Sequence, residues 1–203
     1  MDGLLTWHFQ YQDQIPLFAA VYGGKIQLFS RAYKGDDQVA HRMKAGQSLV
    51  FGEQIGWLNP DLVLKNKETG EFIREMARLR YELRDFLARG EMARPPRVEG
   101  DVPDVTADWA WSGEWPITTS ALQTGAWQAT DGRIAFLFVN VSEAPVKAKW
   151  AFRSSDYGFP ADARFVVVDL QEKTPRNEGA AFARVLDLAP RSTTVFIVKS
   201  TNH

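Results

Sequence analysis

Six short runs of alternating hydrophobic and polar residues follow one another in the second half of the chain. We expect them to be strands over Ala121–Ala129, Ile134–Val141, Val146–Phe152, Arg164–Leu170, Phe182–Leu188 and Thr193–Lys199. A period of two places successive side chains on opposite faces of a sheet. Asp131 and Gly132 separate the first two runs, and this dipeptide favours a type I′ hairpin turn. Short strands joined by frequent turns predict an antiparallel β-sandwich over residues 107–203.

One long amphipathic helix is predicted before this region, over residues 69–88. Its apolar side chains recur at spacings of three and four and form one stripe: Phe72, Met76, Leu79, Leu83 and Phe86. Thr69 is expected as the N-cap and Gly90 as the residue that ends the helix. Arg78 can pair with Glu75 and Glu82 on the exposed face. The sequence therefore indicates a solvated helix that packs on one side.

The segment after the helix is rich in proline and poor in large apolar residues. It covers residues 91–106 and carries prolines at positions 95, 96 and 103. Such a composition is typical of a boundary between structural units. We therefore divide the chain into residues 1–95, a linker at 96–106, and the sandwich at 107–203.

The first unit contains two short continuous apolar runs. Pro16–Val21 and Ser48–Phe51 are each followed by glycine, and we expect both to be strands buried on two faces, as in a parallel sheet. A short helix over Asp36–Ala45 would connect them in a βαβ unit. The predicted fold class is α+β, with a partial α/β segment and a long helix preceding an antiparallel β-sandwich.

Composition restricts the class of protein further. The 203 residues carry 24 Lys and Arg against 25 Asp and Glu, so a basic surface for nucleic acid is not expected. No apolar run approaches the length of about 20 residues that spans a bilayer, and the first residues lack the pattern of a signal peptide. Cysteine is absent, which excludes disulfides and thiol chemistry within this sequence and leaves the compartment unknown.

Four segments together resemble the C-terminal region of large bacterial (β/α)-barrel glycoside hydrolases with a trailing β-sandwich, in the style of α-galactosidases and α-amylases. PLFAAVYGG (16–24) resembles a late barrel strand, and QSLVFGEQIGW (47–57) resembles the last one with its loop. FIREMARLRYELRDFLARGEMARPP (72–96) resembles the closing helix. IAFLFVNVSEAPVKAKWAF (134–152) and LDLAPRSTTVFIV (186–198) resemble the terminal sandwich.

The resemblance implies a carbohydrate-active enzyme of which this chain is the last part. A complete barrel needs eight strands and about 250 residues, whereas about 95 precede the sandwich here. We therefore expect a C-terminal fragment or subunit that is inactive alone. The alternative is a free-standing sugar-binding or structural assembly module. Either a missing N-terminal barrel portion or a homo-oligomer would cover the apolar surface of the incomplete barrel.

Candidate site residues follow from the predicted barrel strands, whose carboxyl ends face the active site in this architecture. Glu53 is the one acid at such an end and is the candidate for a sugar contact or an acid/base role. Tyr22, Arg31, Tyr33 and Trp57 lie near the predicted strand ends, where they could bind sugar or only pack the loops. Glycosidases use two carboxylates, and the resemblance places the main pair on strands that this sequence lacks.

Other site types find less support in the sequence. His8 and His41 lack a second histidine at metal-binding spacing, and no G-x-S-x-G motif is present, so zinc and a serine triad are not expected. Acids at 99, 101, 104 and 108 could bind calcium or form a solvated linker. Asp36 and Asp37 could partner Glu53 in a small hydrolase, or cap a helix. No cofactor is predicted.

Tryptophan is concentrated in the second half of the chain, with three residues in WAWSGEW (109–115). If this segment is a strand, Trp109 and Trp111 lie on the same face. They could form a platform on which sugar rings stack. Alternatively they fill the junction between the sandwich and the preceding segment, since large aromatic residues are usually buried.

Overall fold

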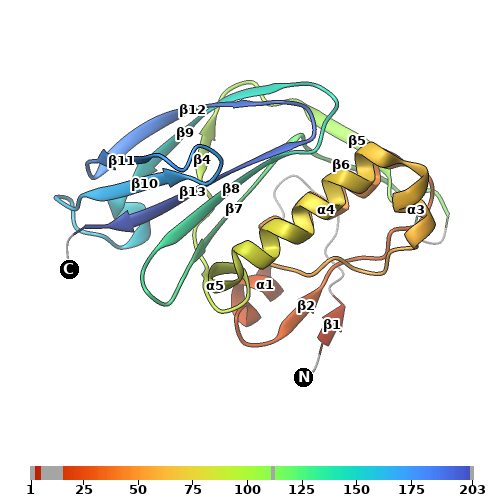
Figure 1. The fold of residues 1–203 in the computed structure, drawn as a ribbon, viewed down its shortest axis with the longest axis horizontal. Coiled ribbons are helices and arrows are strands. Elements are labelled where there is room, and N and C mark those ends of the chain that lie inside the picture. The colour runs from red at the N-terminus through yellow and green to blue at the C-terminus, as the bar shows by residue number, and fades with distance from the viewer. Residues whose placement is uncertain (1–2, 6–15, 111–112, 202–203) are drawn as a thin grey trace.

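The computed structural model describes residues 3–5, 16–110 and 113–201. Figure 1 shows two layers of antiparallel strands on one side of the molecule and the helices, with a short parallel pair, on the other. The fold is α+β with mostly antiparallel sheets, as predicted. Within the described residues no helix is long and apolar enough to cross a membrane.

The β-sandwich consists of two antiparallel sheets. The larger has the order β11-β10-β13-β8-β7-β3 and the smaller has the order β12-β9-β4. The six predicted strands are all present, as β7 (Leu122–Gln128), β8 (Ile134–Asn140), β9 (Val146–Arg153), β10 (Phe165–Asp169), β12 (Ala181–Leu188) and β13 (Ser192–Ser200). A short strand, β11 (Pro175–Glu178), extends the edge of the larger sheet, and a single turn of 3₁₀ helix (Ser154–Tyr157) follows β9.

Strand β8 is buried on both of its faces, because the larger sheet is covered on both sides. Phe136 and Phe138 face the smaller sheet and pack against Trp150 at ring-centroid distances of 4.8 and 5.4 Å. Ala135 and Leu137 face the helices and belong to a second apolar cluster. The continuous apolar sequence IAFLFV is the pattern expected of such a doubly covered strand.

The predicted hairpin between β7 and β8 forms, but its turn is not of type I′. The two strands pair antiparallel from Leu122↔Asn140 to Gln128↔Ile134. Only Gly132 has a positive φ, +83°, and its N–H donates to the Ala129 carbonyl at 2.9 Å. A type I turn followed by a left-handed glycine satisfies the strand twist as well, so one positive φ is enough.

The segment expected to be a linker carries short strands in the structure. β3 (Glu91–Met92) pairs with β7, and β4 (Arg97–Glu99) pairs with β9. β5 (Asp104–Asp108) forms a hairpin with β6 (Pro116–Ser120). The prolines limit these strands to a few residues but do not prevent pairing, because edge positions tolerate a missing N–H donor.

The first unit contains parallel strands, at positions different from those predicted. β1 (Gly3–Leu5) pairs in parallel with β2 (Gln27–Phe29), and Phe29 forms a parallel bridge with Gln54. The expected strand Pro16–Val21 is instead helix α1 (Leu17–Tyr22), and Ser48–Phe51 lies at the end of helix α2 (Gln38–Val50). A short apolar run cannot distinguish a buried helix from a buried strand.

Helix α2 lies between the larger sheet and helix α4. Every residue from Ala40 to Val50 is buried, including the charged Arg42 and Lys44. Asp37 caps it by accepting from the Val39 and Ala40 amides at 2.9 and 3.1 Å. This agrees with the helix predicted over Asp36–Ala45, which the structure extends to Val50.

The long amphipathic helix is confirmed as α4 (Lys67–Glu82), continued by α5 (Arg84–Leu87) and preceded by α3 (Pro60–Lys65). Its N-cap is Asn66, which accepts from the Thr69 amide at 3.0 Å. Thr69, the predicted cap, is buried and accepts from Arg42 instead. Arg78 pairs with both Glu75 and Glu82, as predicted.

Candidate functional site

The loops that follow the parallel strands run side by side and form one edge of the first unit. The Ser30 amide donates to the Gln54 carbonyl, and the Tyr33 amide donates to the Trp57 carbonyl, both at 2.8 Å. Gly56 lies so close to the Arg31 carbonyl that an added Cβ would stand 2.0 Å from that oxygen. We call residues 30–35 and 55–59 the carboxyl edge.

Arg31 is held at the carboxyl edge by contacts to two other segments. Its guanidinium lies 4.6 Å from the centre of the Trp109 ring and donates to the Gln47 side-chain oxygen. Burial lowers the pKa of Arg31 to about 10, while the nearby charges of Glu53 and Tyr33 oppose that shift. Its Nη2 atom is buried without a hydrogen-bond partner among the described residues.

Glu53 does not lie where the sequence predicted. Because the preceding run is a helix, Glu53 stands on the amino side of Gln54 and not at a carboxyl end. It is 2% exposed, and its carbonyl accepts from Arg80 Nε at 2.9 Å. The negative charge of Glu53 raises the pKa of Arg31 and Arg80 against the effect of burial. In this structure Glu53 compensates buried positive charge.

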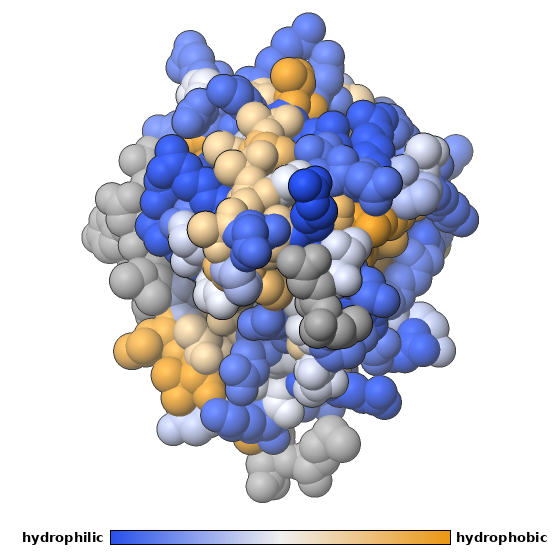
Figure 2. Space-filling view, turned by 90° about the vertical axis from the view of Figure 1, so that its left-hand side faces the viewer, coloured by the Kyte–Doolittle hydropathy of each residue, from blue (hydrophilic) through white to orange (hydrophobic). Residues whose placement is uncertain are grey.

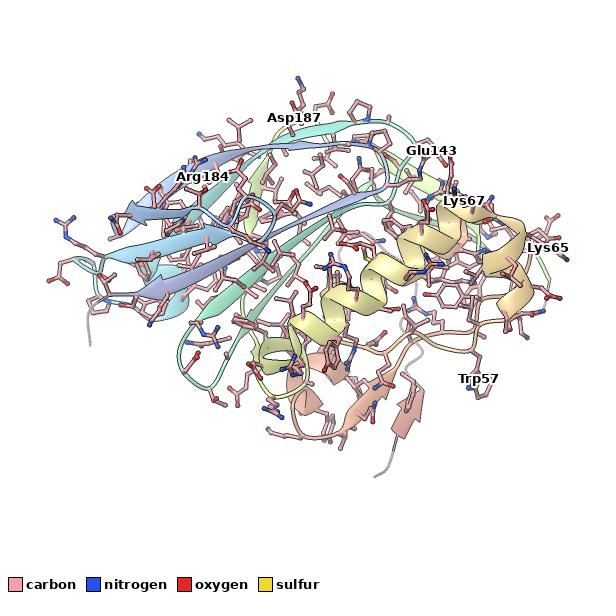
Figure 3. The ribbon with its side chains drawn as sticks, in the orientation of Figure 1. Trp57, Lys65, Lys67, Glu143, Arg184 and Asp187 are labelled. Atoms are coloured by element: carbon pink, nitrogen blue, oxygen red, sulfur yellow. The ribbon has the colours of Figure 1, made fainter. Side chains whose placement is uncertain are left out.

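Tyr33 and Trp57 are neighbours in the carboxyl edge but differ in accessibility. The Tyr33 ring is buried with its centroid 5.8 Å from that of His41, and burial raises the pKa of its hydroxyl. Trp57 is 72% exposed, and Figure 3 shows its side chain pointing away from the body of the molecule. Trp57 is therefore the aromatic face that this edge offers to solvent.

Tyr22 is separated from the other four candidates. It is the last residue of α1, on the amino side of β2, and its ring packs on Phe18 at 4.6 Å. With Leu17, Val21 and Ile26 it forms an exposed apolar patch, which we call the α1 patch. Hydrophobic atoms gather in the lower part of the face shown in Figure 2, below the sandwich. The α1 patch has the character of a contact surface.

Two residues organise the carboxyl edge: Lys44, which the sequence analysis did not single out, and Asp108, which it considered only as a possible calcium ligand. Lys44 on α2 donates to the Trp109 carbonyl at 2.9 Å and to the Ala32 carbonyl at 3.2 Å. Burial, assisted by the positive charge of Arg31, lowers its pKa to about 8. Asp108 accepts from the Ala110 and Trp115 amides and holds the turn that carries Trp109. No local signal marks Lys44, because the helix that carries it also contains His41, Arg42 and Gln47.

The tryptophan cluster is placed only in part. Trp109 is 4% exposed and follows β5 in a turn, since Ala110 has a φ of +43°. Trp115 packs against the same apolar cluster as α2 and α4. Trp111 lies outside the described residues. The position of Trp109 favours the interpretation as a filled junction over a stacking platform.

The remaining candidates from the sequence analysis are Asp37, a metal site and the two histidines. Asp37 uses both carboxylate oxygens, one to cap α2 and one to accept from the Asp108 amide at 3.0 Å, which fits the helix-cap alternative. Among the described residues, no group of three His, Cys, Asp or Glu side chains is placed to hold a metal ion. His8 lies outside the described residues, and His41 is buried.

Comparison with known proteins relates the sequence to glycoside hydrolases. No family model matches the chain. A protein of Bacteroides thetaiotaomicron named "Putative glycoside hydrolase" is 25% identical over 147 residues, which cover 67% of this chain and 20% of that protein. The chain is thus glycoside hydrolase-like in sequence and spans about a fifth of the length of this relative.

Comparison with solved structures gives matches at low TM-scores and low sequence identity. A GH27 β-L-arabinopyranosidase from Geobacillus stearothermophilus has a TM-score of 0.41 at 10% identity, over 81% of this chain and 31% of that one. α-Galactosidase I from Mortierella vinacea has 0.41 at 11%, over 79% and 35%. An Anoxybacillus α-amylase has 0.44 at 9%, over 81% and 33%.

Proposed function

We propose that this chain is the C-terminal part of a carbohydrate-active enzyme related to glycoside hydrolases. In this proposal residues 1–95 are the last strands and closing helix of a (β/α)-barrel, and residues 107–203 are the sandwich that supports it. The parallel order β1, β2 and Gln54, with α1 and α2 between them in sequence, supports this assignment. Similarity to the Bacteroides protein supports the enzyme class.

The observation that carries the proposal is the carboxyl edge itself. In barrels of this kind the active site lies at the carboxyl ends of the strands. Here that edge holds an exposed tryptophan, Trp57, and a buried arginine nitrogen, Arg31 Nη2, for which the described part of the chain supplies no acceptor. Aromatic faces and charged hydrogen-bond donors are groups that bind sugar rings and hydroxyls. We assign these two residues to substrate contact and Glu53 to charge compensation.

The isolated chain is proposed to be catalytically inactive, because the catalytic pair would stand on barrel strands outside it. The test is hydrolysis of nitrophenyl α-galactoside, α-glucoside and β-L-arabinoside by the 203-residue protein. We expect no turnover above the uncatalysed rate. Turnover that disappears in Glu53→Gln would overturn both the inactivity and the role given to Glu53.

A longer reading frame gives the positive test. The DNA upstream of this chain should continue the frame by several hundred codons, and the longer protein should hydrolyse a glycoside. In that protein Trp57→Ala should raise KM about tenfold with a smaller effect on kcat, since it removes uniform binding. The exposed Tyr81→Ala is the matched control, because Tyr81 lies on α4 away from the edge. Equal KM for the two variants would contradict the assignment.

The alternative function, a free-standing sugar-binding or assembly module, is favoured by the α1 patch. Leu17 is 67% exposed and Val21 is 47% exposed on a helix of six residues. Contiguous exposed apolar surface of this kind marks an interface. We therefore expect the isolated chain to associate in solution, with Leu17→Glu shifting it to monomer in multi-angle light scattering. A monomeric parent protein at high concentration would count against an assembly role.

A further inference from the structure

A cavity separate from the carboxyl edge lies where helix α2 meets the open edge of the sandwich. Its volume is about 520 Å³, within the range of small-molecule sites. One wall comes from the end of α2, a second from β6 and β7, and a third from residues 92–102. β7 belongs to the larger sheet, so three segments that are distant in sequence line one space.

The walls of this cavity are neutral. None of the described residues that line it carries a charged side chain. Its polar members are amides and hydroxyls, of which Gln47, Ser120 and Thr124 are examples, and they lie on the α2, β6 and β7 walls. The opposite wall is apolar and includes Pro95, Pro96 and Val98. A neutral ligand with one polar and one apolar face fits these walls better than an ion does.

Strand β7 offers unpaired backbone groups to the cavity at Thr124. β3 pairs with β7 only at Trp127 and Gln128, and the Ala93 amide then donates to the Ala126 carbonyl at 2.8 Å. In an antiparallel ladder, backbone groups alternate between the two sides of a strand. The Thr124 N–H and C=O therefore point, like the Ala126 carbonyl, away from β8 and toward the cavity. Within the described chain no strand pairs with Thr124 on that side.

Among the described residues, the open part of the β7 edge is short and is centred on Thr124. At one end Ala93 occupies the Ala126 carbonyl, and at the other the Leu122 amide donates to Ser120 Oγ at 3.2 Å. Addition of a peptide strand needs several consecutive backbone pairs. A single donor and acceptor pair suits a small ligand whose groups both donate and accept, as hydroxyls do.

Gln47 adds a side-chain amide with a defined orientation. Its Oε1 atom accepts from Arg31, so the group that it has left to offer is the Nε2 donor. Gln123 forms the adjoining wall, and its own Nε2 is held by the Met43 carbonyl at 3.2 Å. Both amides are fixed by the protein before any ligand enters, which reduces the entropic cost of binding.

We propose that this cavity binds a neutral, hydroxyl-rich ligand of the size of a monosaccharide or disaccharide. A pyranose ring presents hydroxyls around its rim and C–H groups on its faces. The hydroxyls would meet Gln47 and the Thr124 backbone, and the C–H face would lie on Pro95 and Pro96. This site adjoins the carboxyl edge through the contact between Gln47 and Arg31. It does not depend on the proposed enzyme class, because sugar binding to the isolated chain can be measured whether or not the chain is part of a hydrolase.

The experiment is isothermal titration of the 203-residue protein with galactose, glucose and arabinose. We expect at least one of these sugars to bind, and galacturonate to bind at least fivefold more weakly because its carboxylate would enter neutral walls. Acetyl-trialanine amide tests for a peptide at the same edge. Preference for the peptide, equal binding of galacturonate, or no binding of any sugar would overturn the proposal.

Two variants locate the site, and a third serves as control. Thr124→Phe should abolish binding by filling the cavity, and Gln47→Leu should raise the dissociation constant about fivefold or more by removing the amide donor. Gln128→Leu, on the same strand but outside the cavity, should leave binding unchanged. Circular dichroism checks that each variant folds. If Thr124→Phe does not fold, Gln47→Leu decides alone, and binding equal to the parent in a folded variant refutes the site.

Discussion

The two units of this molecule differ in whether they bury charged side chains. In the sandwich the fully buried side chains are uncharged and mainly aromatic or aliphatic, and the described ion pairs lie at least partly in solvent. In the first unit Arg42, Lys44 and Glu53 are each 2% exposed. Burying a charge is costly unless it is paired and hydrogen-bonded. The first unit therefore bears the energetic cost of burying charge. Lys44 and Glu53 lie next to the carboxyl edge, where we place function.

The partners of these buried charges come from distant segments. Arg42 donates to the Val141 carbonyl at 3.2 Å and to Thr69 Oγ1 at 3.1 Å, and pairs with Glu143. Lys44 uses backbone carbonyls of the carboxyl edge and of the turn after β5. The first unit is thus joined to the sandwich by polar contacts, while the sandwich is held internally by ring packing. The predictions below test this difference.

The largest effect is expected from the aromatic core of the sandwich. Trp150 is fully buried, and its ring lies 4.8 Å from Phe136 and 5.0 Å from Phe196. Trp150→Ala should lower the free energy of unfolding by about 3–5 kcal/mol, through lost contacts and a cavity. Urea denaturation followed by circular dichroism measures it. Val185→Ala, at an 80% exposed position of the same sheet, should change stability by less than about 0.5 kcal/mol.

If Trp150→Ala cost no more than the Val185 control, the sandwich would not be held by its aromatic core. The proposed difference between the two units would then be wrong for the sandwich.

Lys44 gives the matching test in the first unit, as a function of pH. Its folded pKa of about 8 lies below the unfolded value near 10.4, so the unfolded chain binds more protons between these pH values. The contribution of Lys44 to stability should therefore rise with pH across this window, by about 2–3 kcal/mol in total. Below pH 8 the charged amine is the less favourable form to bury.

The measurement compares urea denaturation of the parent protein and Lys44→Met at pH 7.5 and 10.5. The stability difference between them should move in favour of the parent protein as the pH increases. A difference independent of pH would show that Lys44 titrates normally and that its burial has no electrostatic cost.

Asn140 tests a polar contact inside the sandwich. Its side-chain nitrogen donates to the Ala144 and Ala189 carbonyls at 2.8 and 2.9 Å, and its oxygen accepts from the Ser142 amide at 3.0 Å. Asn140→Ala should cost about 2 kcal/mol, because buried carbonyls lose their donor. The measurement is the thermal melting temperature. Asn177→Ala, at an exposed position of β11, is the control variant. Equal melting temperatures for the two variants would exclude a stabilising role for this network.

The smallest effect on folding is expected at Trp57. Because this side chain is 72% exposed, Trp57→Ala should change the free energy of unfolding by less than about 0.5 kcal/mol. An unchanged free energy of unfolding in this variant would distinguish a ligand contact from a residue that packs the loops. A loss above about 1 kcal/mol in urea denaturation would place Trp57 with Tyr33 as a residue that supports the loops.

Prediction from sequence succeeded where one local pattern has one structural meaning. The alternating run of β9 and the stripe on α4 are each produced by burial of a single face. Prediction failed at α1 and at the end of α2, because a short apolar run is compatible with either a buried helix or a buried strand. As a result Tyr22 and Glu53 were assigned to ends of strands that are helices in the structure. Arg31 and Trp57 lie in the two loops of the carboxyl edge, and their role stays a prediction.

The sequence by itself determined the sandwich strands and the long helix, because local periodicity carries that information. Its likeness to glycoside hydrolases rests on the resemblance of whole segments. Only the tertiary structure decided which charges are buried, what fills the junction around Trp109, and where a neutral cavity remains. The physical reason is that the partners of Arg42, Lys44 and Gln47 are groups on other segments. Their positions depend on how the layers pack, and no local pattern encodes them.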